Sequence, residues 1–238
     1  MNILAVGAHP DDVELNCAGT LAKYAKMGHN IFICTATSGN IGSATLSKEE
    51  IGNLRKQEAA NSAAIIGAEY MCLDYDDELF YEDLDVRINF INMLRHCKPD
   101  VILTHNPHDY NPDHMLTSKI INDIQVMLPI GHIKTMEAPC DKFPVIYYFE
   151  PHKGLGFIPT DFVDITDCFE TKSKMLLCHE SQKAWMAHAY SGFCADDTFL
   201  QDMKTMASFR GMQCGVKYAE GFVRANDAYR VTPSRLLP

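Results

Sequence analysis

Side chains that can bind metals and move protons are concentrated in two short stretches of the 238-residue sequence. Residues 8–14 read AHPDDVE, and within them residues 9–12 place one imidazole beside two carboxylates. Residues 105–114 read HNPHDYNPDH and add three histidines and two aspartates. A catalytic zinc ion takes three protein ligands from His, Asp or Glu and leaves one position open for water. His9, Asp12 and His114 would form such a set.

The remaining aspartates of these stretches are candidates for proton transfer. Asp11 adjoins a ligand in sequence and is expected to point elsewhere, where it could act as the general base toward water activated by zinc. Asp113 could hold an imidazole in one tautomer, and we count it among the candidate catalytic residues for that reason. Structural roles remain open as alternatives, because Asp11 or Asp12 could cap a helix and Glu14 suits the first turn of one.

The elements that must position these residues follow from the apolar pattern. Strands are predicted over residues 3–6, 31–36, 70–73 and 101–104, and helices between them end near Gly28, near Gly67 and at Cys97. The second of these helices opens with a capping box from Ser47 to Glu50. The alternation predicts a Rossmann-like α/β fold, an open and mostly parallel sheet with helices on both faces, in one domain of residues 1–238.

The predicted topology brings the two polar stretches together. In the strand order 3-2-1-4, ligands bind in the crevice between the first and fourth strands, and residues 8–14 and 105–114 follow those two strands. Beyond them we expect a helix from His114 to about Met127, an irregular segment over 129–144 that forms a lid or an edge of the site, and strands over 145–149 and 162–165. Asp167 is expected to cap the next helix.

Composition limits the classes of partner. A formal net charge of −10, with a pI near 5.4, argues against binding to nucleic acids or anionic membranes. No apolar stretch approaches the ~20 residues of a membrane span, and no signal-peptide pattern opens the sequence, so we expect a cytoplasmic protein. Nine cysteines without a Cys-x-x-Cys pair indicate reduced, buried side chains; a lone catalytic cysteine remains an alternative, although nothing places a histidine beside one.

The two stretches carry a resemblance to a known family. AHPDDVE and NPDH (residues 111–114) resemble the A-H-P-D-D-x-E and H-P-D-H signatures of the LmbE-like, or PIG-L, deacetylases. The later segments 179–182 (HESQ) and 218–222 (YAEGF) are similar to the family's H-x-S-Q and Y-A-E-x-F. The resemblance implies zinc held by His9, Asp12 and His114, with Asp11 as general base. It also implies an N-acetylglucosamine-containing conjugate as the small-molecule substrate, and a homo-oligomer.

One residue departs from the family pattern. Asn111 stands where the family has histidine, and an amide cannot act as an imidazolium acid, although it can donate a hydrogen bond to an oxyanion. The chain would then use Asn111 more weakly or recruit His108 or His179, each of which could equally be a histidine without a role in chemistry. Arg55 matches a position expected to approach the substrate, and the alternative is an exposed arginine paired with Glu58.

Three other functions compete with zinc-dependent removal of an acetyl group. The first is a non-catalytic protein that binds zinc and a glycoconjugate, with Asn111 as the sign of lost chemistry. The second is a zinc amidase that acts on a larger acyl group of an amino-sugar conjugate. A nucleotide-binding oxidoreductase is disfavoured, because the first strand-to-helix turn carries His-Pro-Asp-Asp instead of a Gly-x-Gly-x-x-Gly sequence.

Overall fold

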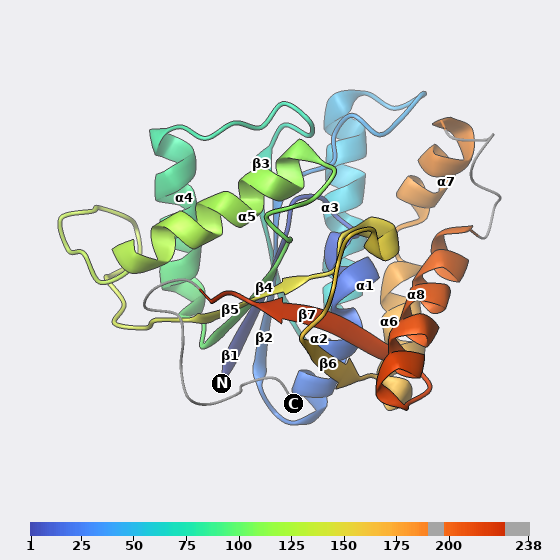
Figure 1. The fold of residues 1–238 in the computed structure, drawn as a ribbon. Helices are drawn as coiled ribbons and strands as arrows, with labels where there is room; N and C mark the ends of the chain where they lie inside the picture. The colour runs from blue at the N-terminus through green and yellow to red at the C-terminus, as the bar shows by residue number, and fades with distance from the viewer. Residues whose placement is uncertain (190–197, 227–238) are drawn as a thin grey trace.

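The computed structural model describes residues 1–189 and 198–226. Seven strands form one sheet in the order β3-β2-β1-β4-β5-β7-β6 (Figure 1). They are β1 (Asn2–Gly7), β2 (Asn30–Thr37), β3 (Glu69–Tyr75), β4 (Val101–Thr104), β5 (Val145–Phe149), β6 (Asp161–Asp164) and β7 (Ala219–Arg224). Strands β1 to β5 are parallel, and β7 runs antiparallel to both its neighbours. The predicted order 3-2-1-4 is confirmed.

Helices cover both faces of the sheet (Figure 1). α4 (Leu84–Cys97) and α5 (Pro112–Ile124) pack on one face. The other face is covered by α1 (Asp12–Asn16), α2 (Ala18–Lys26), α3 (Lys48–Ala64), α6 (Phe169–Leu176) and α8 (Thr198–Cys214). Strand β1 shows why both faces are apolar: Ile3 and Ala5 enter one core, and Leu4 and Val6 enter the other. None of the described helices has the length and hydropathy needed to cross a membrane.

The helix predicted after β1 is divided in two at Cys17. The Glu220 carboxylate, from β7, accepts hydrogen bonds from the backbone N–H of Gly19 and Thr20 and from the Thr20 hydroxyl, and it pairs with the buried Lys172. A carboxylate placed there satisfies the free N–H groups that begin α2. The break therefore depends on a residue about two hundred positions away, which local periodicity cannot reveal.

The predicted capping interactions are present in α3 but not in α6. The capping box of Ser47 and Glu50 is present, and Gly67 takes a φ of +67° just beyond the helix. A 3-10 turn, η3 (Thr166–Cys168), precedes α6, and no side chain caps that helix. The prediction that Asp167 caps it is therefore wrong, because the chain enters the helix through a tighter turn.

The segment 129–144 lies away from the predicted crevice. It follows a second 3-10 turn, η1 (Gln125–Met127), and contains no helix or strand. The buried Arg95, in the last turn of α4, donates hydrogen bonds to the backbone oxygens of residues 128, 130 and 133, and Lys142 pairs with Asp100 just before β4. These contacts place the segment at the edge where the strands begin. The prediction that residues 129–144 form a lid or an edge of the site is therefore wrong.

Candidate metal centre

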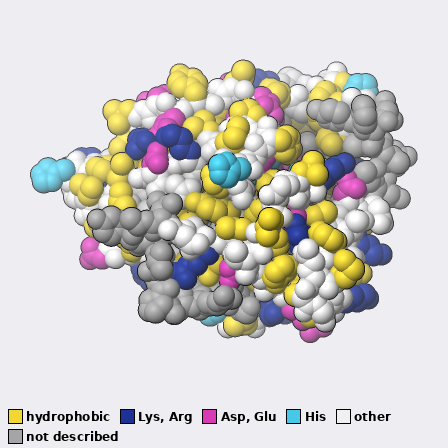
Figure 2. All heavy atoms as spheres, in the orientation of Figure 1, with side chains coloured by type: hydrophobic (Ala, Val, Ile, Leu, Met, Phe, Trp, Pro, Cys, Tyr) yellow, Lys and Arg dark blue, Asp and Glu magenta, His cyan; other side chains and the backbone are white. Residues whose placement is uncertain are grey.

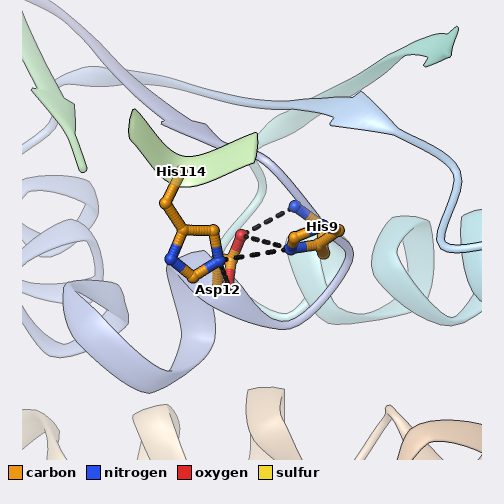
Figure 3. A group of neighbouring side chains, drawn as sticks. All are labelled: His9, Asp12 and His114. Atoms are coloured by element: carbon orange, nitrogen blue, oxygen red, sulfur yellow. Dashed lines mark hydrogen bonds and ion pairs between the residues drawn. The ribbon is translucent and has the colours of Figure 1, made fainter. Parts of the chain in front are cut away.

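The three predicted ligands converge where the first and fourth strands end (Figure 3). His9 follows β1, Asp12 begins α1, and His114 lies in the first turn of α5. His114 Nε2 lies 3.2 Å from His9 Nδ1 and 3.3 Å from Asp12 Oδ1, and His9 Nδ1 lies 3.5 Å from Asp12 Oδ2. All three residues are buried. The fold thus brings together side chains that lie more than a hundred positions apart in the sequence.

The spacing of these donors fits a divalent metal ion. Zinc bonds to imidazole and carboxylate are about 2.0–2.2 Å long, so tetrahedral ligand atoms lie about 3.4 Å from one another. The three distances between His9, Asp12 and His114 match that separation, and the donor set of two nitrogens and one carboxylate suits such an ion. Three protein ligands leave the fourth position for water or substrate.

Further aspartates orient the two imidazoles. Asp109 Oδ1 lies 3.1 Å from His114 Nδ1, which leaves Nε2 facing the ligand cluster. His9 Nε2 lies 3.0 Å from Asp77 Oδ1 and 3.3 Å from Asp113 Oδ2, which leaves Nδ1 facing it. Carboxylates in these positions fix the tautomer of a metal-binding histidine and strengthen it as a ligand. The orienting role expected of Asp113 therefore has a geometric basis, shared with Asp77.

Electrostatics favour charged forms among the ligands. Burial alone would lower the pKa of His114, but the carboxylates of Asp12 and Asp109 raise it to about 9. Burial would raise the pKa of Asp12, and the imidazoles of His114 and His105 instead hold it well below its usual range. A metal ion that binds here must replace protons on the imidazoles, because only neutral imidazole is a ligand.

Asp11 lies in the same cavity and has a different environment. Burial raises its pKa to about 7, although the Arg55 guanidinium, 3.7 Å away, opposes that shift. Its φ of +114° is unusual for a residue with a side chain. Its side chain makes no capping hydrogen bond to α1, so the alternative of a helix cap is wrong for Asp11. A carboxyl group that titrates near neutral pH suits proton transfer.

A cavity of about 470 Å³ opens over these groups. Helix α7 (Glu180–Ala189) contributes Gln182, Trp185 and Met186 to its wall, and Tyr110 and His152 add further rings. His152 belongs to the 3-10 turn η2 (His152–Gly154), shortly after β5. Acidic side chains and rings together line a pocket large enough for a small molecule.

Asn111 lines this cavity as a helix cap. Its Oδ1 accepts hydrogen bonds from the backbone N–H of Asp113 and His114, and its Nδ2 donates to Glu78 Oε1. The amide thus holds the turn that carries the His114 ligand. Its polar atoms are engaged within the protein, so the catalytic role predicted for Asn111 stays a prediction, whereas its positioning role is evident.

Arg55 is buried, whereas the alternative interpretation required an exposed side chain. Glu58 does not pair with Arg55 and instead accepts hydrogen bonds from Ser181. The alternative interpretation of Arg55 is therefore wrong. Its guanidinium donates to the backbone oxygens of Gly39 and Pro10, which ties the loop after β2 to the loop that carries the ligands. It also lines the cavity, so a substrate contact stays open as a prediction.

The two histidines proposed as replacements for the family histidine lie elsewhere. His108 is exposed and is not among the described residues that line the cavity. His179 is buried, with Nε2 3.3 Å from Glu14 Oε1, and is likewise absent from that lining. Their predicted substrate contacts thus have no support from the geometry. The carboxylate of Glu14 also accepts a hydrogen bond from Ser62, so it joins the polar core behind the site.

Sequence reasoning missed several residues of the site. Asp77 and Asp109 orient the ligands, His105 stacks on His114 with ring centroids 3.9 Å apart, and His152 lines the cavity. Each lies within a few residues of the carboxyl end of a parallel strand. That position was the available signal, because ligands bind at this edge of such sheets.

Comparison with known proteins is consistent with this geometry. Residues 4–125 match the family described as "PIG-L: GlcNAc-PI de-N-acetylase". The diacetylchitobiose deacetylase of Thermococcus kodakarensis is 27% identical over 234 residues, which cover 92% of this chain and 81% of that protein. The 4-oxalmesaconate hydratase of Pseudomonas putida is 25% identical over 190 residues, 76% of this chain and 73% of that one.

Solved structures share the same fold. The N,N'-diacetylchitobiose deacetylase from Pyrococcus horikoshii, in complex with its inhibitor MPG, superposes with a TM-score of 0.79 at 27% identity. The superposition covers 94% of this chain and 83% of that one. The predicted α/β fold is thereby confirmed beyond the matched residues 4–125.

Proposed function

This chain belongs to the PIG-L family, and from that membership we propose that it is a zinc-dependent hydrolase that removes the N-acetyl group of an N-acetylglucosamine-containing conjugate. The observation that carries the proposal is the cluster of His9 Nδ1, His114 Nε2 and the Asp12 carboxylate in a cavity that also contains Asp11. Relatives of this chain are deacetylases of such substrates. The expected homo-oligomer and cytoplasmic location stay predictions.

The residues of the cavity divide the work of amide hydrolysis. A divalent ion, when bound, supplies Lewis acidity that polarises a carbonyl and acidifies water. Asp11 takes a proton from the attacking water and returns it to the amide nitrogen. The amino sugar can then leave as a neutral amine. The C–N bond breaks, and the products are acetate and the free amino sugar. Asp77, Asp109 and Asp113 keep the imidazoles oriented throughout.

His152 is our candidate for the hydrogen-bond donor that Asn111 does not supply. It lines the cavity together with His9, Asp12 and His114, whereas the amide of Asn111 is engaged in capping α5. Removing one donor to an oxyanion costs about 100-fold in kcat or more. His152→Ala should therefore lower kcat by about that factor while metal content is retained. His108→Ala, measured beside it by steady-state kinetics, should cause the smaller loss; the reverse order would contradict the assignment.

The carboxylates of the cavity suit a product that becomes positively charged on hydrolysis. Among the described residues that line it, five carboxylates face one guanidinium. They are Asp11, Asp12, Asp77, Glu78 and Asp109, against Arg55. Carboxylates in this number stabilise the ammonium ion that forms when the amide of an amino sugar is hydrolysed.

Product analysis tests the proposed reaction. Purified protein with zinc should release acetate and primary amine in equal amounts from N,N'-diacetylchitobiose or from N-acetylglucosamine glycosides, because each cleaved amide yields one of each. Both products can be followed by NMR, with 4-oxalmesaconate as the competing substrate. Hydration of that carboxylate without amine release would contradict the proposal. Binding of the sugars without turnover would favour the non-catalytic alternative.

A further inference from the structure

A second hollow of about 200 Å³ adjoins the metal cavity. Leu15, Asn16 and His152 border both spaces, so the two lie on either side of these residues. The remaining walls of the second hollow come from the link between β5 and η2, from η2 itself, and from α6, α8 and β7. Its position places it next to any sugar that binds in the metal cavity, with His152 at the boundary.

The charged groups that border this hollow are paired within the protein. Arg210 Nε donates to both oxygens of Glu150, Lys172 pairs with Glu220, and Lys153 Nζ lies 3.6 Å from Asp202. What remains to contact a ligand is mostly apolar. The apolar members of the lining are Leu15, Pro151, Met203, Met206, Ala207 and Ala219.

Helix α8 and η2 pack against each other beside this hollow. A Cβ atom on Gly154 would lie 2.8 Å from Met206 Cε, so the backbone of η2 packs directly on that side chain. Methionine is flexible and polarizable and adapts to irregular apolar ligands. Hydrophobic side chains also reach the surface on the face where α8 lies (Figure 2). Leu155, directly after η2, and Met212, in α8, are both exposed.

We propose that this hollow binds an apolar substituent of the substrate, either an alkyl or aryl aglycone or an N-acyl chain longer than acetyl. The inference rests on the proposed function, because it places the sugar in the metal cavity; with a substituent on the nitrogen, the acyl group removed would be a longer chain in place of acetyl. An uncharged, apolar group fits a space whose ionic groups are already paired. The substrate class would then be a hydrophobic amino-sugar conjugate.

The test is a chain-length series of ligands that contain no amide, so that binding is measured apart from hydrolysis. One arm uses methyl, butyl and hexyl β-D-glucosides, and the other uses N-methyl-, N-butyl- and N-hexylglucosamine; Kd is measured by calorimetry on the zinc-loaded protein. Each buried methylene should lower Kd about fourfold until the hollow is full. The arm that shows this trend identifies the attachment point, and a trend in both arms means that the hollow is within reach of both positions.

Matched variants on α8 assign the trend to the hollow. Met206→Lys, which places a charge in the hollow, should make Kd nearly independent of chain length. Met212→Lys changes the same residue type on the same helix at an exposed position and should keep the wild-type trend. Equal Kd values across both wild-type series, or a trend unchanged in Met206→Lys, would overturn the proposal. Amine release from short glycosides with no chain-length effect would overturn this inference alone.

Discussion

Replacing His114 by alanine should leave a protein that no longer retains its metal ion and no longer hydrolyses the substrate. Nε2 of His114 is one of three ligand atoms that lie 3.2 to 3.5 Å apart, and two remaining donors cannot close a tetrahedral site. Losing an orienting partner alone typically costs about 10- to 100-fold in metal affinity. Loss of the His114 ligand itself should lower metal affinity by more than that. Asp109→Asn, which removes only an orienting partner, should lower metal affinity by about 10- to 100-fold.

Elemental analysis of the purified variants measures this effect, with amine release measured in parallel. His132→Ala is a suitable control, because it removes an exposed histidine from the segment 129–144 at the opposite edge of the sheet. Circular dichroism would establish that both variants are folded. Near-stoichiometric metal in folded His114→Ala would show that His114 is not a ligand.

Asp11→Asn should bind metal normally and hydrolyse the substrate about 100- to 10,000-fold more slowly, the range expected when a positioned base is lost. The amide has nearly the same size as the carboxyl group but cannot accept the proton of the attacking water. Within the described residues, Asp11 has Arg55 as its ion-pair partner, and Asp77 also lies 3.9 Å from that guanidinium. Unlike Asp11, the carboxylates of Asp12, Asp77, Asp109 and Asp113 all pair with imidazoles. The loss should appear in kcat more than in KM.

Steady-state kinetics together with metal analysis separate a lost base from a lost ion. Asp141→Asn makes the same exchange at an exposed position far from the cavity and should behave as the wild type. If Asp11→Asn kept full kcat with metal bound, another group would have to act as the base.

The sequence was sufficient to bring the three proposed ligands together because two simple patterns agree. Buried strands in the order 3-2-1-4 bring the ends of β1 and β4 together, and the ligand-type residues directly follow those strands. Local spacing could not show which carboxylate faces which imidazole nitrogen. Asp77 and Asp109 became visible only with the ring orientations of His9 and His114.

Two other features depend on contacts that no local pattern contains. Cys17 separates α1 from α2 because Glu220 of β7 occupies the start of the second helix. The segment 129–144 is irregular in sequence, and only the hydrogen bonds of Arg95 show that it belongs to the edge where strands begin. Asn111 is the converse case, because a residue that departs from the family pattern is explained by a common local role as a helix cap.

The most direct measurement is amine release from N,N'-diacetylchitobiose by one preparation of protein before metal removal, after chelation, and after zinc is restored. Zinc-dependent deacetylation predicts that activity disappears as the metal is removed and returns as about one zinc ion per chain is bound. Full hydrolysis by the metal-free protein, or no amine release from the zinc-loaded protein on this or any N-acetylglucosamine conjugate, would contradict it.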